Sequence, residues 1–174
     1  MLEVKSGNIE KLGLLYERHK KRLFGFYYQM NKDVALSEDL IQNVFERMLK
    51  YKHTFTVESN FISWMFQIAR NINYDHFKKN KKSRYNTDIT EVSDRIKDGE
   101  DIDEQIIFKE DSSNLKKALD RLSVDKKEIL MLSRFKELRY SEIGSVLGCS
   151  EGAARIKAHR ALNDLRNIFL KLEK

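Results

Sequence analysis

The sequence contains no proline and only seven glycines in 174 residues. Because the many tight turns of an all-β fold usually need both residue types, this scarcity argues against such a fold. The single cysteine, Cys149, excludes a disulfide framework and a zinc site built from several cysteines. No apolar run reaches the length of about 18 residues that a membrane-spanning helix needs. Residues 1–10 lack an apolar signal core, so we expect a cytoplasmic protein.

Sequence signatures of catalysis are also missing. The four histidines, His19, His53, His76 and His159, are scattered without the spacing of metal ligands. We find no phosphate-binding glycine loop and no nucleophile motif. The sequence therefore predicts no enzyme, no catalytic residue, no metal and no cofactor. We expect each histidine at the surface or at a helix cap, and Cys149 as a small packed side chain.

Charge is abundant and unevenly distributed. The chain carries 33 basic and 27 acidic side chains, a net charge of +6. Residues 70–84 hold six basic side chains against Asp75 alone, whereas residues 85–111 hold ten acidic against three basic ones. We interpret 85–111 as an acidic flexible linker, either a solvated connector or a strip that mimics nucleic acid and screens the basic surfaces. The positive remainder predicts an anionic partner.

Apolar residues recur at helical spacing on both sides of this linker, and no strand pattern is evident. The sequence predicts an all-α fold of two small helical domains, at residues 1–84 and 112–174. In the first domain we expect one helix through residues 9–30 and a second that Ser37 caps. A polar loop over 51–60 leads to a third helix over 61–79. In the second domain we expect four helices, at about 113–121, 125–135, 140–147 and 151–172.

The third expected helix has two distinct faces. An ordinary core stripe comprises Phe61, Trp64, Met65, Ile68 and Ile72. On the opposite side lie Phe66, Arg70, Asn73 and Phe77, with Tyr74 beside them. Aromatic rings can stack on unpaired bases while cations bind phosphates, so this second face is a candidate platform for DNA that is being opened. The alternative is a second packing face in which the two phenylalanines are buried.

Residues 140–155 have the pattern of a helix-turn-helix. Gly144 is small where two helices must cross closely, Gly148 suits a turn with positive φ, and Ser150 can cap the following helix. We expect its inward face to hold Ala154, Ala158, Ala161, Leu162 and Leu165. The outward face would present Gly152, Ala153, Arg155, Ile156, Lys157, His159, Arg160 and Asn163. Arginine and asparagine read base edges, and basic side chains bind phosphates.

These segments together resemble one family. Residues 119–162 resemble domain four of bacterial sigma factors, and residues 37–45 (SEDLIQNVF) resemble the sigma segment that binds the polymerase clamp. Residues 61–77 (FISWMFQIARNINYDHF) resemble the helix that opens the minus-ten element. Two such domains and a linker, over about residues 9–170, are typical of the extracytoplasmic-function (ECF) branch. The resemblance implies a promoter-recognition subunit that binds core RNA polymerase, at its clamp and flap, and promoter DNA.

The resemblance also assigns roles to residues. Contacts with polymerase fall on Asp39, Gln42, Asn43 and Glu46. The loop from Thr54 to Asn60 would capture a flipped minus-ten base, and Asp75 lies on the DNA-contacting helix. With the candidate platform included, the minus-ten contacts are Thr54, Asn60, Phe66, Arg70, Asn71, Asn73 and Lys78. The minus-thirty-five contacts are Arg155, Ile156, Lys157, His159 and Arg160.

The chain departs from the family pattern in its reading helix. Ala153 and Ile156 replace hydroxyl residues, Leu162 replaces a basic one, and Ser123 stands where a proline is usual. We therefore expect weak discrimination at the minus-thirty-five element. An anti-sigma factor and an additional DNA-targeting recruiter are further partners that the resemblance allows. The alternative function is a helix-turn-helix regulator that acts without being a polymerase subunit.

Overall fold

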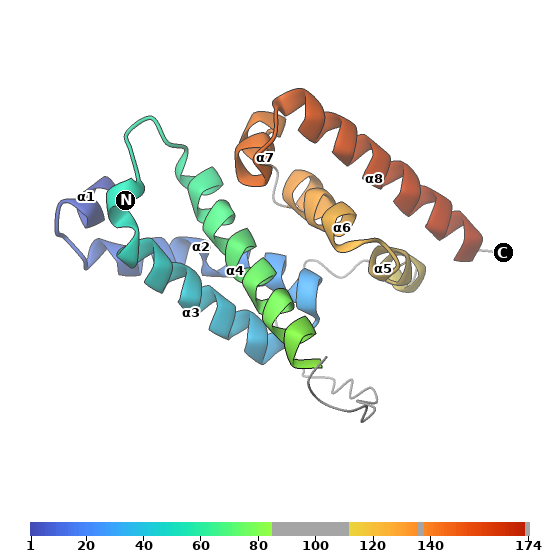
Figure 1. The fold of residues 1–174 in the computed structure, drawn as a ribbon, viewed down its shortest axis with the longest axis horizontal. Helices are drawn as coiled ribbons and strands as arrows, with labels where there is room; N and C mark the ends of the chain where they lie inside the picture. Colours follow the sequence, from blue (N-terminus) through green and yellow to red (C-terminus); the bar gives the residue numbers. More distant parts are fainter. Residues whose placement is uncertain (85–111, 136–137, 173–174) are drawn as a thin grey trace.

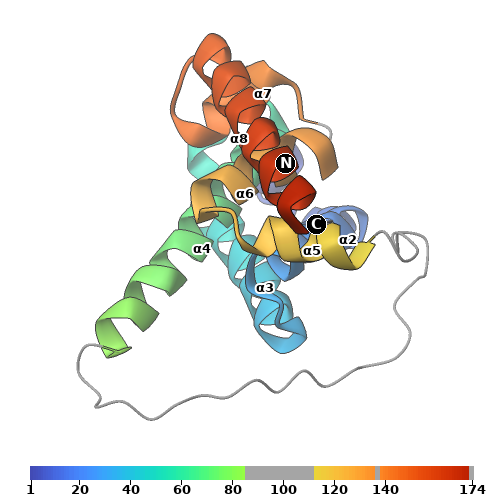
Figure 2. The ribbon, with the colours of Figure 1, turned by 90° about the vertical axis from the view of Figure 1, so that its right-hand side faces the viewer.

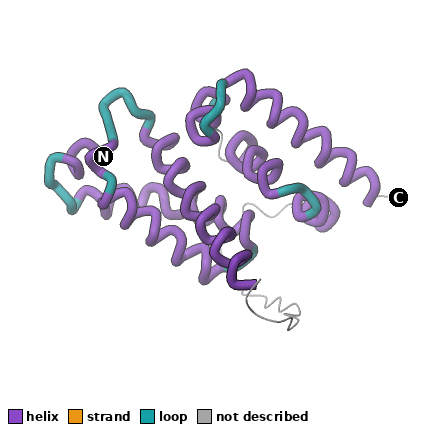
Figure 3. Tube along the Cα trace, viewed as in Figure 1, coloured by secondary structure: helices purple, strands orange, loops and turns teal. Residues whose placement is uncertain are grey.

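The computed structural model describes residues 1–84, 112–135 and 138–172, and all its regular secondary structure is helical (Figure 3). The predicted acidic linker, 85–111, lies outside the described residues. Within the described part of the chain, no helix combines the length and the apolar character needed to span a membrane. The N-terminal domain holds α1 (Leu2–Lys5), α2 (Lys11–Asn31), α3 (Val34–Lys50), the 3-10 turn η1 (Lys52–Thr54) and α4 (Phe61–Arg84). The C-terminal domain holds α5 (Ser112–Asp120), α6 (Val124–Leu130), the π-helical turn η3 (Met131–Phe135), α7 (Tyr140–Leu147) and α8 (Glu151–Leu172).

The turn between α2 and α3 corrects the predicted start of α3. Lys32 adopts a left-handed conformation (φ 57°) that ends α2, and Asp33 is extended. The Asp33 carboxylate accepts a hydrogen bond from the Leu36 amide at 2.9 Å, so Asp33 is the N-cap. Ser37, the predicted cap, is buried one turn inside the helix, where its hydroxyl donates to the Asp33 carbonyl. The helix cap therefore lies four residues earlier than we expected.

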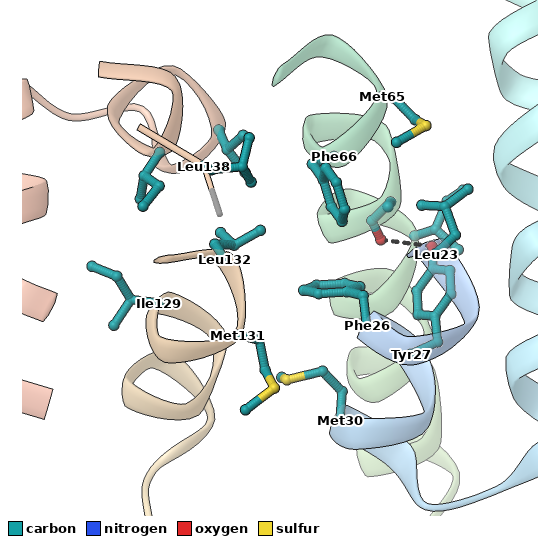
Figure 4. Close-up of a cluster of buried hydrophobic side chains, with 14 of the residues drawn as sticks. Leu23, Phe26, Tyr27, Met30, Met65, Phe66, Ile129, Met131, Leu132 and Leu138 are labelled. Carbon is teal, nitrogen blue, oxygen red and sulfur yellow. Dashed lines mark hydrogen bonds between the residues drawn. The ribbon is translucent and has the colours of Figure 1, made fainter. Parts of the chain in front are cut away.

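The N-terminal domain is built around α4, which packs against α2 and α3 (Figure 1). The predicted core stripe faces these helices, with Met65 and Ile72 buried. The buried Tyr27 hydroxyl donates to the Ala69 carbonyl at 2.9 Å and so joins α2 to α4 (Figure 4). This arrangement leaves one long side of α3 exposed to solvent.

The C-terminal domain contains the predicted helix-turn-helix, α7 and α8. Gly148 has a φ of 66° and ends α7, and the Ser150 hydroxyl accepts from the Ala153 amide at 3.2 Å to cap α8. A Cβ on Gly144 would lie 2.6 Å from the Cys149 carbonyl oxygen, which explains why this position needs the smallest residue. The inward face of α8 is an alanine stripe, Ala154, Ala158 and Ala161, that is buried as predicted. Leu162, which we expected to point inward, is 37% exposed.

The two domains pack directly against each other (Figure 2). α4 contacts α7, and α2 contacts α6 and η3. The buried side chains form one continuous cluster that crosses the boundary. In Figure 4, Met30 of α2 and Met131 of η3 point toward one another, and Phe66 lies on the side of α4 that faces Leu132 and Leu138. The two predicted helical domains therefore share one core.

Candidate functional site

The predicted polymerase-binding residues lie along the exposed side of α3. Asp39, Gln42, Asn43 and Glu46 are all exposed, whereas Val44 on the opposite side is fully buried. The Asn43 amide donates to the Asp39 carbonyl at 2.9 Å, and this bond uses one donor of the strip. The four side chains of the strip are carboxylates and amides, and none of them is a cation. Such a surface suits a basic or amide-rich partner.

The predicted base-capturing loop is anchored by one aromatic side chain. Phe55 is buried, and its ring meets Phe61 and Trp64 edge-on at centroid distances of 6.2 and 5.2 Å. Thr54 and Asn60, the predicted contacts, are exposed on either side of this anchor. The side-chain oxygen of Asn60 accepts from the Ser63 amide at 3.0 Å and caps α4. The loop therefore presents polar side chains from an anchored backbone.

On the second face of α4, Phe66 and Asn73 are packed inside the protein. Phe66 has 0% exposed surface, meets Phe26 edge-on at 5.6 Å, and is covered by the C-terminal domain. Asn73 is 3% exposed, and its side-chain oxygen accepts from the Asn31 amide of α2 at 3.1 Å. Neither residue is accessible to DNA in the described arrangement. The packing alternative describes both here, because Asn73 bonds to α2 and Phe66 packs against Phe26 and faces the C-terminal domain.

The other predicted residues of α4 remain at the surface or near it. Asn71 and Lys78 are exposed. Arg70 is half-buried and donates from Nε to a Glu128 carboxylate oxygen of α6 at 3.0 Å. Asp75, which lies on the predicted DNA-contacting helix, pairs with Arg47 of α3 at 2.9 Å.

Two carboxylates of the C-terminal domain reach residues predicted to touch DNA. Glu128 binds Arg70, and burial raises the pKa of the Glu128 carboxyl although the Arg70 guanidinium beside it acts in the opposite direction. One oxygen of Glu142 accepts from the Asn60 amide at 2.8 Å, while the other accepts from the Arg139 backbone at 2.7 Å. Two of the residues predicted to contact the minus-ten element, Arg70 and Asn60, are thus bonded to carboxylates of the C-terminal domain.

The sequence analysis missed Glu128 and Glu142. Their partners lie 58 and 82 residues away in the chain. No local spacing signals such contacts. The one available signal is that they are acidic residues in a basic domain, and this signal alone assigns no role to either residue.

The outward side of α8 is exposed as predicted. Ile156 is 54% exposed, and Lys157, His159 and Arg160 are exposed around it. Arg155 is held by Glu151 at 3.0 Å and lies over the Tyr140 ring, 5.5 Å from its centroid. The helix therefore presents cations, of which Arg155 is already oriented, around one apolar side chain.

The other titratable side chains that the structure describes do not gather into a second site. His19, which we expected at the surface or at a cap, is buried against Phe61, and burial lowers its pKa. Cys149 is half-buried and packs against the core. Among the described residues, no three His, Cys, Asp or Glu side chains come close enough to hold a metal ion.

The comparisons with known proteins agree on both halves of the chain. The Sigma-70 region 2 family model matches residues 15–83, and the Sigma-70 region 4 model matches residues 112–165. The RNA polymerase sigma factor CarQ of Myxococcus xanthus is 30% identical over 160 residues, which are 91% of this chain and 89% of CarQ. The ECF sigma factor SigX of Bacillus subtilis is 29% identical over 163 residues, with 90% and 82% of the two chains covered.

Solved structures with the same fold are also found. The sigma factor RpoE in complex with the anti-sigma factor NepR, from Bartonella quintana, superposes with a TM-score of 0.71 at 24% identity. The match covers 95% of this chain and 99% of that one. CnrH in complex with the cytosolic domain of CnrY superposes with a TM-score of 0.73 at 19% identity, over 99% and 96% of the chains.

Proposed function

Because the chain belongs to the ECF family of RNA polymerase sigma factors, we propose that its two domains divide promoter recognition between them. A member of this family directs RNA polymerase to promoters and is not an enzyme. The alternative of a regulator that acts without being a polymerase subunit is therefore wrong. Residues 1–84 are the domain that binds core polymerase and the minus-ten element, residues 112–174 are the minus-thirty-five domain, and residues 85–111 are the acidic linker between them.

The exposed strip on α3 carries this proposal. Asp39, Gln42, Asn43 and Glu46 share one side of a helix whose other side is buried in the core. A strip of acidic and amide groups is complementary to a basic or amide-rich surface, and we assign core polymerase as that partner. The assignment of these four residues to the polymerase clamp is our proposal.

The DNA contacts are divided between two surfaces. Thr54, Asn60, Arg70, Asn71 and Lys78 contact the minus-ten element, with the loop from Thr54 to Asn60 receiving an unpaired base. Arg155, Ile156, Lys157, His159 and Arg160 of α8 contact the minus-thirty-five element. Phe66 and Asn73 are left out because both are buried and also contact α2 of their own domain, which separation of the two domains does not change.

The described arrangement is closed with respect to promoter DNA. Glu128 is bonded to Arg70, and Glu142 is bonded to Asn60. The two domains therefore separate before Arg70 and Asn60 bind the minus-ten element. We place the protein in the cytoplasm, where core polymerase and promoters are found. RpoE was solved in complex with an anti-sigma factor, so we include an anti-sigma factor among the partners of this chain.

The test of this function is reconstitution with core polymerase. We expect the double variant Gln42→Lys, Glu46→Lys to lose co-purification with core polymerase and promoter-directed transcription, because it reverses the charge of the strip. Its circular dichroism spectrum stays unchanged, since both side chains are exposed. The control is Glu17→Lys, which reverses an exposed carboxylate on α2 that pairs with Lys20 at 2.7 Å. Equal co-purification of the double variant and the control would refute the assignment.

A further inference from the structure

A short helix at the start of the described chain packs against the base-capturing loop. α1 contacts both η1 and α2. Although α1 has only four residues, its Val4 side chain has 0% exposed surface. A salt bridge of 3.5 Å between Glu3 and Lys11 ties the same helix to the first turn of α2. The helix is therefore fixed on one side to α2 and on the other to the loop.

Two lysine side chains link α1 to the loop, one reaching from α1 and the other from η1. The Lys5 ammonium donates to the Phe55 carbonyl at 2.7 Å, and the Lys52 ammonium donates to the Val4 carbonyl at 3.4 Å. Both bonds are partly buried and join segments about fifty residues apart. A charged donor makes a stronger hydrogen bond than a neutral one, particularly away from solvent. The backbone at Phe55 is consequently held by a bond that is independent of its ring contacts.

Phe55 anchors the loop through both its ring and its backbone carbonyl. Its ring is held by Phe61 and Trp64 of α4, and its carbonyl is held by Lys5 of α1. Beyond it, the Thr56 hydroxyl lies 2.8 Å from the Ser59 hydroxyl and closes the tip of the loop. The exposed residues that follow start from a backbone with little freedom. A preorganised loop recognises its ligand without a further ordering cost.

We propose that α1 is a positioning element for minus-ten recognition, in which Lys5 and Lys52 fix the loop that receives the unpaired base. Lys5 acts through the Phe55 carbonyl and does not itself contact the base. The inference rests on the proposed function of residues 54–60. It assigns a role in promoter discrimination to residues 1–6, which precede the segment that the region 2 family model matches.

The test measures base preference, because a purely structural defect would lower transcription from all promoters alike. Holoenzyme with Lys5→Met transcribes a set of promoters that differ only in the minus-ten bases. We expect the preference for the best base to fall about three- to tenfold, the size of one net hydrogen bond. Affinity for core polymerase stays unchanged, because α3 is untouched. Lys5→Arg keeps a charged donor and restores most of the preference, while Lys20→Met is the control for the loss of a positive charge on α2.

Two further variants separate the outcomes. If Thr54→Ala and Asn60→Ala leave the minus-ten preference unchanged, the proposed function of the loop is wrong. If these loop variants change the preference and Lys5→Met and Lys52→Met do not, the loop function stands and the role of α1 is refuted. If the Lys5→Met protein does not fold, Lys52→Met tests the same link between α1 and the loop by removing the second lysine hydrogen bond. A uniform loss of transcription with base preference retained would also overturn the proposal.

Discussion

At the scale of single residues, Gly144 sets how closely α7 approaches the start of α8. A Cβ at this position would meet the Cys149 carbonyl at 2.6 Å and the Ser150 carbonyl carbon at 3.3 Å. Both are backbone atoms of the turn, which cannot move aside as the end of a flexible side chain can. The turn itself is fixed by the left-handed conformation of Gly148.

We expect Gly144→Ala to lower the free energy of unfolding by about 1–3 kcal/mol, because the methyl group overpacks the turn. Urea denaturation followed by circular dichroism measures the change. Gly152→Ala on α8 is the matched control, since a Cβ there meets nothing within 4 Å and alanine favours the helix. A Gly144→Ala protein as stable as the Gly152→Ala protein would show that the turn adapts.

At the scale of elements, α4 follows the loop that we propose to receive an unpaired base. Asn60, just before α4, and Arg70 within it both bond to the C-terminal domain, and our proposal releases both when the domains separate. A phosphate contact positions DNA, whereas a contact with an unpaired base acts only after the strands open. Residues near the loop should therefore affect opening more than initial binding.

We expect Asn60→Ala and Arg70→Ala to weaken transcription more than they weaken formation of the closed promoter complex. Permanganate footprinting of unpaired thymines measures strand opening, and gel shift at low temperature measures initial binding. Arg18→Ala, an exposed arginine of α2, is the control for lost positive charge. Wild-type permanganate reactivity in both α4 variants would contradict the assignment.

The reading helix, α8, presents few groups that can distinguish bases. Ile156 and Ala153 offer no side-chain hydrogen bond, and Arg155 is engaged by Glu151 and Tyr140. A good bidentate base contact contributes about 1–3 kcal/mol of discrimination, whereas phosphate contacts contribute none. The cations of α8 therefore supply affinity more than specificity.

We expect binding of the upstream element to depend strongly on salt and weakly on sequence. Holoenzyme transcription from promoters with a randomised minus-thirty-five element measures the preference. Most specificity would then come from the minus-ten element or from an additional DNA-targeting protein. If single upstream base changes each reduce transcription about a hundredfold, near the upper end of what one bidentate contact contributes, α8 discriminates strongly between bases and the inference is refuted.

At the scale of the whole molecule, the contact between the domains buries a carboxylate at its centre. The Glu128 side chain is 8% exposed, and its pKa is raised because burial outweighs the nearby Arg70. The neighbouring Asp125 raises it further. A raised pKa in the closed form means that protonation favours closure. Closure is then strongest at a pH below the ordinary carboxyl pKa and weakens as the pH rises through the raised value.

We expect the wild-type protein to become more compact as the pH falls from neutral towards the ordinary carboxyl pKa, because Glu128 takes up a proton on closure. Small-angle X-ray scattering measures the radius of gyration. Glu128→Gln removes this titration and should stay compact at both ends of the range, with weaker promoter binding by the holoenzyme at neutral pH. Asp164→Asn, which alters an exposed pair with Lys126, should behave like the wild type. If the Glu128→Gln protein is instead more extended than the wild type at neutral pH, the charged pair stabilises closure and the expectation is wrong.

The sequence alone determined the features that depend on neighbouring residues. The helical periods, the glycine that ends α7, the Ser150 cap and the alanine stripe of α8 are local or one-face patterns, and all are found in the structure. The family resemblance has the same origin, because its motifs are continuous segments. The start of α3 was misplaced since both Asp33 and Ser37 suit a cap, and only the left-handed backbone at Lys32 selects the earlier one.

Only the tertiary structure decided which side of α4 is covered. Helical spacing separated Phe66 and Asn73 from the core stripe, but spacing cannot say whether a second domain lies against that side. Several contacts join residues 50 or more positions apart: those of Glu128 and Glu142, and the hydrogen bond from Lys5 to the Phe55 carbonyl. Such contacts depend on how whole helices are placed in space. Their energies come from burial and geometry, neither of which is encoded within a short window of sequence.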